Sequence, residues 1–189
     1  PVEILPVDTN GVVDLAWLAA ALGRPGLALV AIHHANNESG VIQPIAEAAR
    51  LVRAAGGWLH VDAIQSAGKI PVDMRALDAD TLTLSAHKLG GPQGVGALVM
   101  GEGREAVQML HGAGQERGLR AGTENVPGIT GFGASAGGGG GVACAWAESV
   151  SPGSCWNSIT VPAAMTADSV HNAAVFIAAS SVNAGFRPG

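Results

Sequence analysis

The sequence predicts an α/β fold in which a mostly parallel sheet is connected by crossover helices. Apolar runs of strand length recur along the first half of the 189-residue chain, and a helical apolar pattern separates two of them. Hydrophobic residues make up 48% of the chain and charged residues 13%, which suits a well-buried core. The length is that of a single domain.

The first predicted helix covers residues 15–22, because Asp14 can cap its start and Gly23 can end it. The run LALVAIHHA at 27–35 then predicts a buried strand. Pro44 opens a second helix with its apolar residues on one stripe, and two glycines end it. The stripe consists of Ile45, Ala48, Leu51, Val52 and Ala55.

A second strand, WLHVDA, runs from Trp58 to about Asp62, and a third, TLTLSA, covers 81–86 after a short helical turn at 73–77. Alternation of strands and helices implies parallel pairing. The run VGALVM at 95–100 follows too closely for a parallel crossover, so we expect it to be antiparallel if it pairs with its predecessor. The polar, Gly-rich stretch 111–125 predicts an ordered loop.

The composition changes after Ala136. Five glycines occupy 137–141, only three of the last 53 residues are charged, and leucine, present 15 times before this point, is absent after it. We therefore treat 137–189 as a separate Gly/Ala/Ser-rich tail without clear helix or strand periodicity. A reading-frame error or an unrelated junction explains this composition better than a natural domain, and we expect such a tail to be flexible.

Several classes of partner are disfavoured. The net charge is −5 and the sequence lacks a basic run, so nucleic acid is not expected. No apolar stretch is long enough to span a bilayer, and the first residues do not form a signal peptide. Two cysteines, Cys144 and Cys155, do not make a disulfide framework, so the expected compartment is the reducing cytoplasm.

The chain contains only two lysines, Lys69 and Lys88. Lys88 follows a predicted strand and precedes a Gly-rich turn, where ligands of open α/β sheets bind, whereas Lys69 lies on a connecting segment away from a predicted strand end. A shielded lysine can act as a Schiff-base amine. Asp62 ends the neighbouring strand, and a carboxylate there can keep a pyridine nitrogen protonated. A solvated lysine and a capping aspartate remain the alternative.

Other polar residues near strand ends allow further readings. The histidines at 33, 34, 60 and 87 suggest a metal site, but no ligand-like spacing occurs, and polar packing or cofactor contacts fit better. Ser85 and His87 flank Lys88 and could hold a phosphate. Neutral hydrogen-bonding groups on loops are provided by Asn37, Gln65 and Thr123. Arg117 and Arg120 could contact an anion or be solvated.

Four segments together resemble one family: HHANNESG (33–40), HVDAIQSAGK (60–69), LSAHKLGGPQGVGALV (84–99) and GAGQERGLRAGTENVPGI (112–129). They are similar to the class V aminotransferases, and within these to the cysteine desulfurases that supply sulfur for iron–sulfur clusters. The resemblance covers about residues 2–136. It implies that 1–136 is part of the large, pyridoxal-phosphate-binding domain of a fold type I enzyme, with the antiparallel strand near 95–100.

The resemblance also implies roles around the pyridoxal 5'-phosphate ring. Lys88 would hold the cofactor covalently, and Asp62 would pair with the pyridine nitrogen. Gln65 would contact the phenolic oxygen, and Asn37 would lie beside the ring and the substrate.

The phosphate would be bound by Ser85 and His87. Because enzymes of this family are dimers, Thr123 would reach the phosphate of the partner subunit. No metal is implied. The family's upstream phosphate loop and ring-stacking histidine do not occur within this sequence, and neither Cys144 nor Cys155 matches the family's catalytic cysteine.

The implied reaction converts L-cysteine into L-alanine and leaves the sulfur as a protein persulfide, which an acceptor such as an iron–sulfur scaffold receives. Two alternatives remain open. The chain could be an inactive truncated fragment of such an enzyme, or its parent could be another class V enzyme, a selenocysteine lyase or an aminotransferase. The chain by itself is not expected to turn over cysteine.

Overall fold

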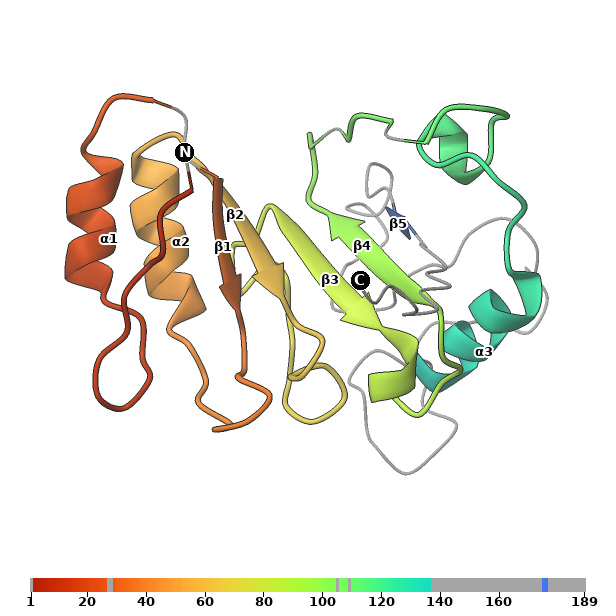
Figure 1. Cartoon of the computed structure of the whole chain (residues 1–189), viewed down its shortest axis with the longest axis horizontal. Helices are drawn as coiled ribbons and strands as arrows, with labels where there is room; N and C mark the ends of the chain where they lie inside the picture. Colours follow the sequence, from red (N-terminus) through yellow and green to blue (C-terminus); the bar gives the residue numbers. More distant parts are fainter. Residues whose placement is uncertain (1, 27–28, 105, 109, 137–174, 177–189) are drawn as a thin grey trace, which may run out of the picture.

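The structure of the chain is a computed structural model that describes residues 2–26, 29–104, 106–108, 110–136 and 175–176. The strands form one sheet in the order β1-β2-β3-β4-β5 (Figure 1). β1 (Leu29–His33), β2 (Trp58–Asp62) and β3 (Thr81–Ser85) are parallel. The predicted mostly parallel sheet is therefore confirmed.

β4 (Gly96–Met100) runs antiparallel to β3, as its short connection predicts, with Ser85 opposite Gly96. β5 (Val175–Phe176) pairs antiparallel with β4. This two-residue strand was not expected in the predicted tail. The rest of 137–189, and with it the predicted flexibility and the proposed frame error, lies outside the described residues.

The two predicted helices are present as α1 (Leu15–Leu22) and α2 (Ile45–Ala54). Asp14 caps α1 by accepting a hydrogen bond from the backbone N–H of Trp17 at 2.9 Å. Two short 3-10 helices, η1 (Ala86–Lys88) and η2 (Glu116–Gly118), and a further helix, α3 (Val126–Ala136), follow. Each described helix is too short or too polar to cross a membrane.

The connection between β2 and β3 contains the predicted short helical turn. It consists of hydrogen-bonded turns, including one in which the Leu77 N–H donates to the Asp73 carbonyl at 2.9 Å. Asp78 then adopts a positive φ of 50°, which a continuing α-helix does not allow. The predicted turn at 73–77 is therefore present, but it is not extended into a helix.

Strand alternation separates an apolar face of the sheet from a polar one. Leu59, Val61 and Leu82 are buried on one face and belong to the core that α1 and α2 complete. Each contributes about 1.5–3 kcal/mol through burial of its side chain. The intervening residues His60 and Asp62 lie half-buried on the other face, so the polar side chains of β2 point away from this core.

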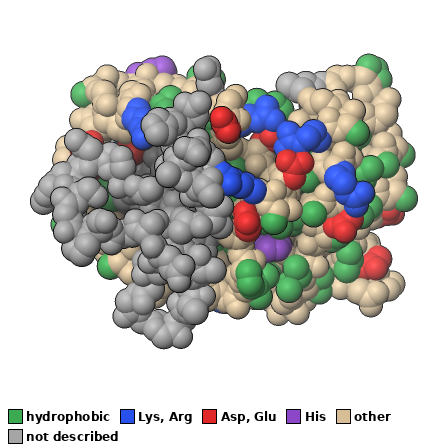
Figure 2. All heavy atoms as spheres, turned by 180° about the vertical axis from the view of Figure 1, so that it is seen from behind, with side chains coloured by type: hydrophobic (Ala, Val, Ile, Leu, Met, Phe, Trp, Pro, Cys, Tyr) green, Lys and Arg blue, Asp and Glu red, His purple; other side chains and the backbone are tan. Residues whose placement is uncertain are grey.

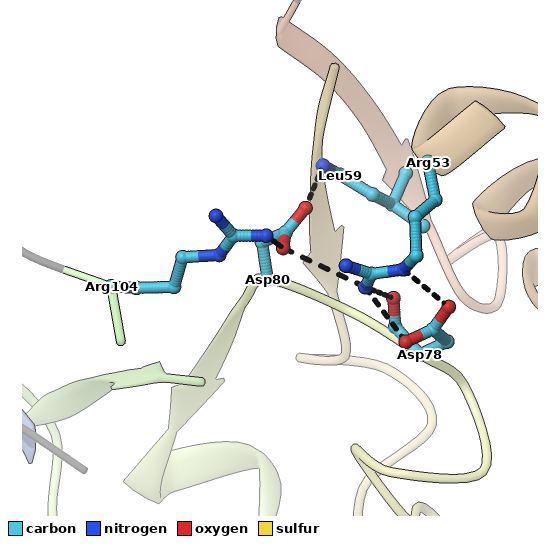
Figure 3. Close-up of polar contacts among 5 residues, drawn as sticks. All are labelled: Arg53, Leu59, Asp78, Asp80 and Arg104. Carbon is cyan, nitrogen blue, oxygen red and sulfur yellow. Dashed lines mark hydrogen bonds and ion pairs between the residues drawn. The ribbon is translucent and has the colours of Figure 1, made fainter. Parts of the chain in front are cut away.

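An ionic cluster lies at the end of the sheet where β2 and β3 begin (Figure 3). Asp80 is buried, accepts a hydrogen bond from the Leu59 N–H at 2.7 Å, and forms ion pairs with Arg104 and, at 3.7 Å, with Arg53. The Arg104 guanidinium also lies 4.5 Å from the centre of the Trp58 ring. The cluster connects α2 and three strands at this end of the sheet.

The reverse face of the molecule carries mixed charge. Figure 2 shows basic side chains lying beside acidic ones on the described part of that face. Nucleic-acid-binding surfaces gather basic residues on one side instead. The described part of this face therefore does not have the charge distribution of a nucleic-acid-binding surface.

Candidate functional site

The site is built at the edge where β1, β2 and β3 end, here called the carboxyl edge. Parallel pairing places His33 beside Asp62, and Asp62 beside Thr83, so that neighbouring strands end together. The segments that follow these strands carry predicted site residues, namely Asn37 after β1, Asp62 and Gln65 at and after β2, and Ser85, His87 and Lys88 at and after β3. The structure thus brings six of the predicted residues to one edge.

Asp62 is half-buried, and only one of its two carboxylate oxygens accepts a hydrogen bond within the described part of the chain. One carboxylate oxygen accepts a hydrogen bond from the Ile64 N–H at 2.8 Å, which makes Asp62 a turn-capping residue as well. Within the described part of the chain, no side chain forms a hydrogen bond or ion pair with Asp62. Its second oxygen is therefore available to a ligand carrying a protonated nitrogen.

The register neighbour of Asp62 on β1 carries a buried polar atom that has no hydrogen-bond partner among the described residues. His33 pairs with Asp62 in the register of β1 and β2, and its Nε2 is buried without a hydrogen bond among the described residues. Buried polar atoms of this kind are usually satisfied by water or a ligand. The available oxygen of Asp62 suits a ligand with a protonated nitrogen, and His33 Nε2 provides a further polar atom on the adjoining strand.

Lys88 is the last residue of η1, which follows β3 directly. Its side chain is exposed rather than shielded, and among the described residues its amine has no hydrogen bond or ion pair. The Ser85 hydroxyl lies 2.8 Å from the His87 Nδ1, so the two predicted phosphate-binding groups contact each other. An amine, a hydroxyl and an imidazole are thus presented within four residues of chain.

Asn37 lies exposed on a tight loop that Asn36 organises. The Asn36 side-chain oxygen accepts hydrogen bonds from the N–H groups of Glu38 and Ser39, both at 2.9 Å. The Asn36 N–H donates to the Val41 carbonyl at 2.9 Å and closes the loop. Sequence reasoning singled out Asn37 but missed Asn36, although an Asn followed by a Gly-containing turn is a signal for such a loop.

Lys69 lies closer to the carboxyl edge than the sequence suggested. Lys69 was expected away from a strand end, but its Nζ lies 3.5 Å from the Gln65 side-chain oxygen on the turn after β2. The turn folds back because the Lys69 N–H donates to the Ser66 carbonyl at 3.0 Å. Proximity therefore does not by itself distinguish Lys88 from Lys69.

Thr123 belongs to a later segment of the chain than these residues. It is exposed between η2 and α3. The same segment holds Glu116, whose pKa is raised by burial and then by the charge of Glu124.

Gly96 allows β4 to approach the strand that leads to Lys88. A Cβ at this position would lie 2.7 Å from the Leu84 carbonyl oxygen, closer than van der Waals contact permits. Because backbone cannot yield as a flexible side chain does, only glycine fits opposite Ser85. Gly96 therefore contributes to the position of the β3 end.

The histidines do not form a metal centre in the described part of the chain, where no group of three or more potential ligands comes together. Burial lowers the pKa of His34. Burial also lowers the pKa of His60, against the opposing charge of Asp62, and His60 Nδ1 contacts the Thr81 hydroxyl at 2.8 Å. These contacts make His34 and His60 part of the polar packing, one of the two alternatives to a metal site that the sequence left open.

Comparisons with known proteins show which chains this one is similar to. A relative from Anaeromyxobacter sp. (strain Fw109-5), named cysteine desulfurase IscS, is 50% identical over 137 residues, which are 71% of this chain and 34% of the relative. One from Archaeoglobus fulgidus, named cysteine desulfurase IscS 1, is 47% identical over 135 residues, 71% of this chain and 35% of the relative. The chain thus spans about a third of the length of these relatives.

Solved structures give the same result. A NifS-like protein from Rickettsia africae matches with a TM-score of 0.67 and 42% identity, over 69% of this chain and 37% of that one. A structure described as SspA in complex with cysteine matches with a TM-score of 0.65 and 38% identity, over 71% of this chain and 39% of that one. The sequence model of the family described as aminotransferase class-V matches residues 1–137. The chain therefore belongs to the class V aminotransferase family, whose members depend on pyridoxal phosphate, and its relatives there are named cysteine desulfurases.

Proposed function

We propose that the protein encoded by this gene is a pyridoxal-phosphate-dependent cysteine desulfurase, which converts L-cysteine to L-alanine and transfers the sulfur to a protein thiol. The observation that carries the proposal is the gathering of Lys88, Asp62 and Gln65 at one edge of a sheet in a chain 50% identical to a relative named cysteine desulfurase. The bound cysteine described for SspA supports cysteine as the substrate class.

The residues of the carboxyl edge suit the cofactor that the family implies. Lys88 would hold it through its amine, and the uncommitted oxygen of Asp62 would keep the pyridine nitrogen protonated. Gln65 would exchange its contact with Lys69 for the phenolic oxygen, and Asn37 would border the ring. When bound, pyridoxal phosphate supplies an electron sink for the bonds at the substrate's α-carbon.

The phosphate would bind at the start of η1. The Ser85 hydroxyl and the His87 imidazole already contact each other, and both can donate to a phosphate oxygen. Lys88 follows them directly and can change between holding the cofactor and moving a proton once substrate is bound. These three residues would therefore fix the cofactor at both its phosphate and its reactive carbon.

The quaternary state and the cellular setting are further parts of the proposal. We expect a cytoplasmic homodimer in which the exposed Thr123 reaches the phosphate bound by the partner subunit. The exposure of Thr123 supports this arrangement, because an exposed side chain is accessible to a second subunit. The sulfur would pass to an acceptor such as an iron–sulfur scaffold, as the IscS name of the relatives suggests. In this proposal residues 1–136 are part of the cofactor-binding domain, and 137–189 are a separate tail.

The full-length product of the gene offers a direct test. With pyridoxal phosphate and L-cysteine we expect alanine and protein-bound persulfide in equal amounts, and none from Lys88→Ala. Lys69→Ala is the matched control and should remain active. Transfer of the amino group to a keto acid, with no alanine formed from cysteine, would show that the protein is an aminotransferase of another specificity. Selenocysteine as the only accepted substrate would identify a lyase.

A further inference from the structure

Three buried polar side chains lie behind the carboxyl edge, apart from the residues assigned above. His34, Gln43 and Ser66 are each at most 6% exposed. Burial of such groups is costly unless they are hydrogen-bonded, so their partners show what they hold in place.

The backbone of His34 joins two of the segments that carry site residues. Its N–H donates to the Asp62 carbonyl at 2.8 Å, and its carbonyl accepts from the Gln43 N–H at 2.9 Å. Gln43 then fixes the turn at residues 8–13, because its side chain accepts a hydrogen bond from the Val13 N–H at 2.9 Å and donates one to the Gly11 carbonyl at 2.8 Å. The neck of the Asn37 loop is thus attached to the end of β2.

The side chain of His34 reaches the turn that carries Gln65. His34 Nδ1 lies 3.0 Å from the Ser66 hydroxyl oxygen, and this hydroxyl in turn donates to the Ala63 carbonyl at 3.2 Å. A serine hydroxyl has a single proton. We assign that proton to the Ala63 carbonyl, which leaves the His34 Nδ1–H as the donor to Ser66. Burial lowers the pKa of His34, which favours the neutral ring.

We propose that His34 is a positioning residue, a neutral Nδ1–H donor that fixes the Asn37 loop and the Gln65 turn relative to the end of β2. Gln65 directly precedes Ser66, and the turn is closed by the Ala67 N–H donating to the Ala63 carbonyl at 2.9 Å. Loss of the His34 contact frees the Ser66 side of this turn and with it the Gln65 side chain. The consequence for the cofactor rests on the proposed function, whereas the ring tautomer and the turn geometry do not.

The test uses three variants of the full 189-residue chain. His34→Leu removes the donor, and Ser66→Ala removes the acceptor with a smaller change of volume. His34→Asn is the rescue variant, because an asparagine Nδ2 can occupy nearly the position of the histidine Nδ1 and is always neutral. If His34→Leu fails to fold, Ser66→Ala and His34→Asn still decide the outcome.

Two measurements separate positioning from general stability. Nitrogen-15 NMR of the ring should show a protonated Nδ1 and an unprotonated Nε2, and the Gln65 side-chain amide resonances should shift in His34→Leu and Ser66→Ala but not in His34→Asn. With pyridoxal phosphate added, the dissociation constant should rise about tenfold in the first two variants and stay within about twofold in the third, as loss of one hydrogen bond predicts.

The opposite results overturn the proposal. An Nε2–H or charged ring would contradict the tautomer, and variants that lower only the melting temperature, with unchanged Gln65 resonances and cofactor affinity, would make His34 a packing residue. If the unmodified chain does not bind pyridoxal phosphate at all, the proposed function fails. The ring tautomer and the Gln65 resonances still test the positioning role in that case.

Discussion

Two aspartates at opposite ends of the same sheet differ in their burial and in their ion pairs. Asp80, where β3 begins, is 4% exposed and is neutralised by Arg104 and Arg53 (Figure 3). Asp62, where β2 ends, is half-buried and accepts a hydrogen bond from one backbone N–H, that of Ile64. In the described part of the chain, no arginine or lysine forms an ion pair with Asp62.

The difference separates a stabilising carboxylate from an available one. A buried charge is tolerated when its partners compensate its lost hydration, and removing either partner is then costly. A carboxylate without such partners contributes little to folding and retains the capacity to bind a ligand. We infer that one end of the sheet is built for stability and the carboxyl edge for chemistry, and the predictions below test this division.

The largest expected effect is on activity. Asp62→Asn in the full-length gene product should lower kcat on the order of 10³-fold, because the pyridine nitrogen loses the charge that keeps it protonated. Its unfolding free energy should stay within about 0.5 kcal/mol, because an asparagine oxygen can still accept the Ile64 hydrogen bond. Steady-state kinetics and urea unfolding measure the two effects. A large loss of stability would show that Asp62 is also a structural carboxylate.

The reverse pattern is expected for Asp80→Asn. The variant keeps an acceptor for the Leu59 N–H but leaves Arg104 without its charge partner, whereas Arg53 keeps Asp78, so the unfolding free energy should fall by about 3 kcal/mol. Asp78→Asn is the matched control, because the Arg53–Asp78 pair is 47% exposed on both sides and should contribute less than about 1 kcal/mol. Equal losses in both variants would contradict the special place of Asp80.

Gly96→Ala tests how closely β4 packs against the backbone of β3, the strand that leads to Lys88. We expect a loss of about 2 kcal/mol, since the new methyl group would meet the Leu84 carbonyl oxygen at 2.7 Å. Gly133→Ala in α3 is the control, because its Cβ would enter open space and the helix should gain up to about 1 kcal/mol. Denaturant midpoints compare the two. A neutral Gly96→Ala would show that β4 can move away from β3.

The smallest effect concerns pH. His34 and His60 have pKa values below the ordinary 6.5 because of burial, so below that pH the unfolded state binds more protons than the folded state. Their contribution is complete above about pH 6.5 and is lost as the pH falls, with a slope of at most about 1.4 kcal/mol per pH unit for each ring. The double variant His34→Asn, His60→Gln should flatten this dependence in urea titrations. An unchanged slope would assign it to other groups.

Sequence reasoning captured what local patterns encode. The alternation of strands and helices predicted the parallel order, and the short connection after β3 predicted the antiparallel β4. The roles of Asp62 and Lys88 stay predictions. Contacts such as His34 with Ser66 and Asp80 with Arg104 join residues more than 20 positions apart, and no local pattern specifies them. α3 also escaped prediction, because its sequence contains three glycines, which weaken helix propensity.

The identity of the lysine that holds the cofactor is the central claim to test, since both Lys88 and Lys69 lie near the carboxyl edge. The chain is incubated with pyridoxal phosphate, reduced with borohydride and digested, and the labelled peptide is identified by mass spectrometry. We predict that the pyridoxyl group is on Lys88, that Lys88→Ala abolishes the label, and that Lys69→Ala leaves it unchanged. A label on Lys69 alone would contradict the assignment of Lys88 and the division of roles between the two ends of the sheet.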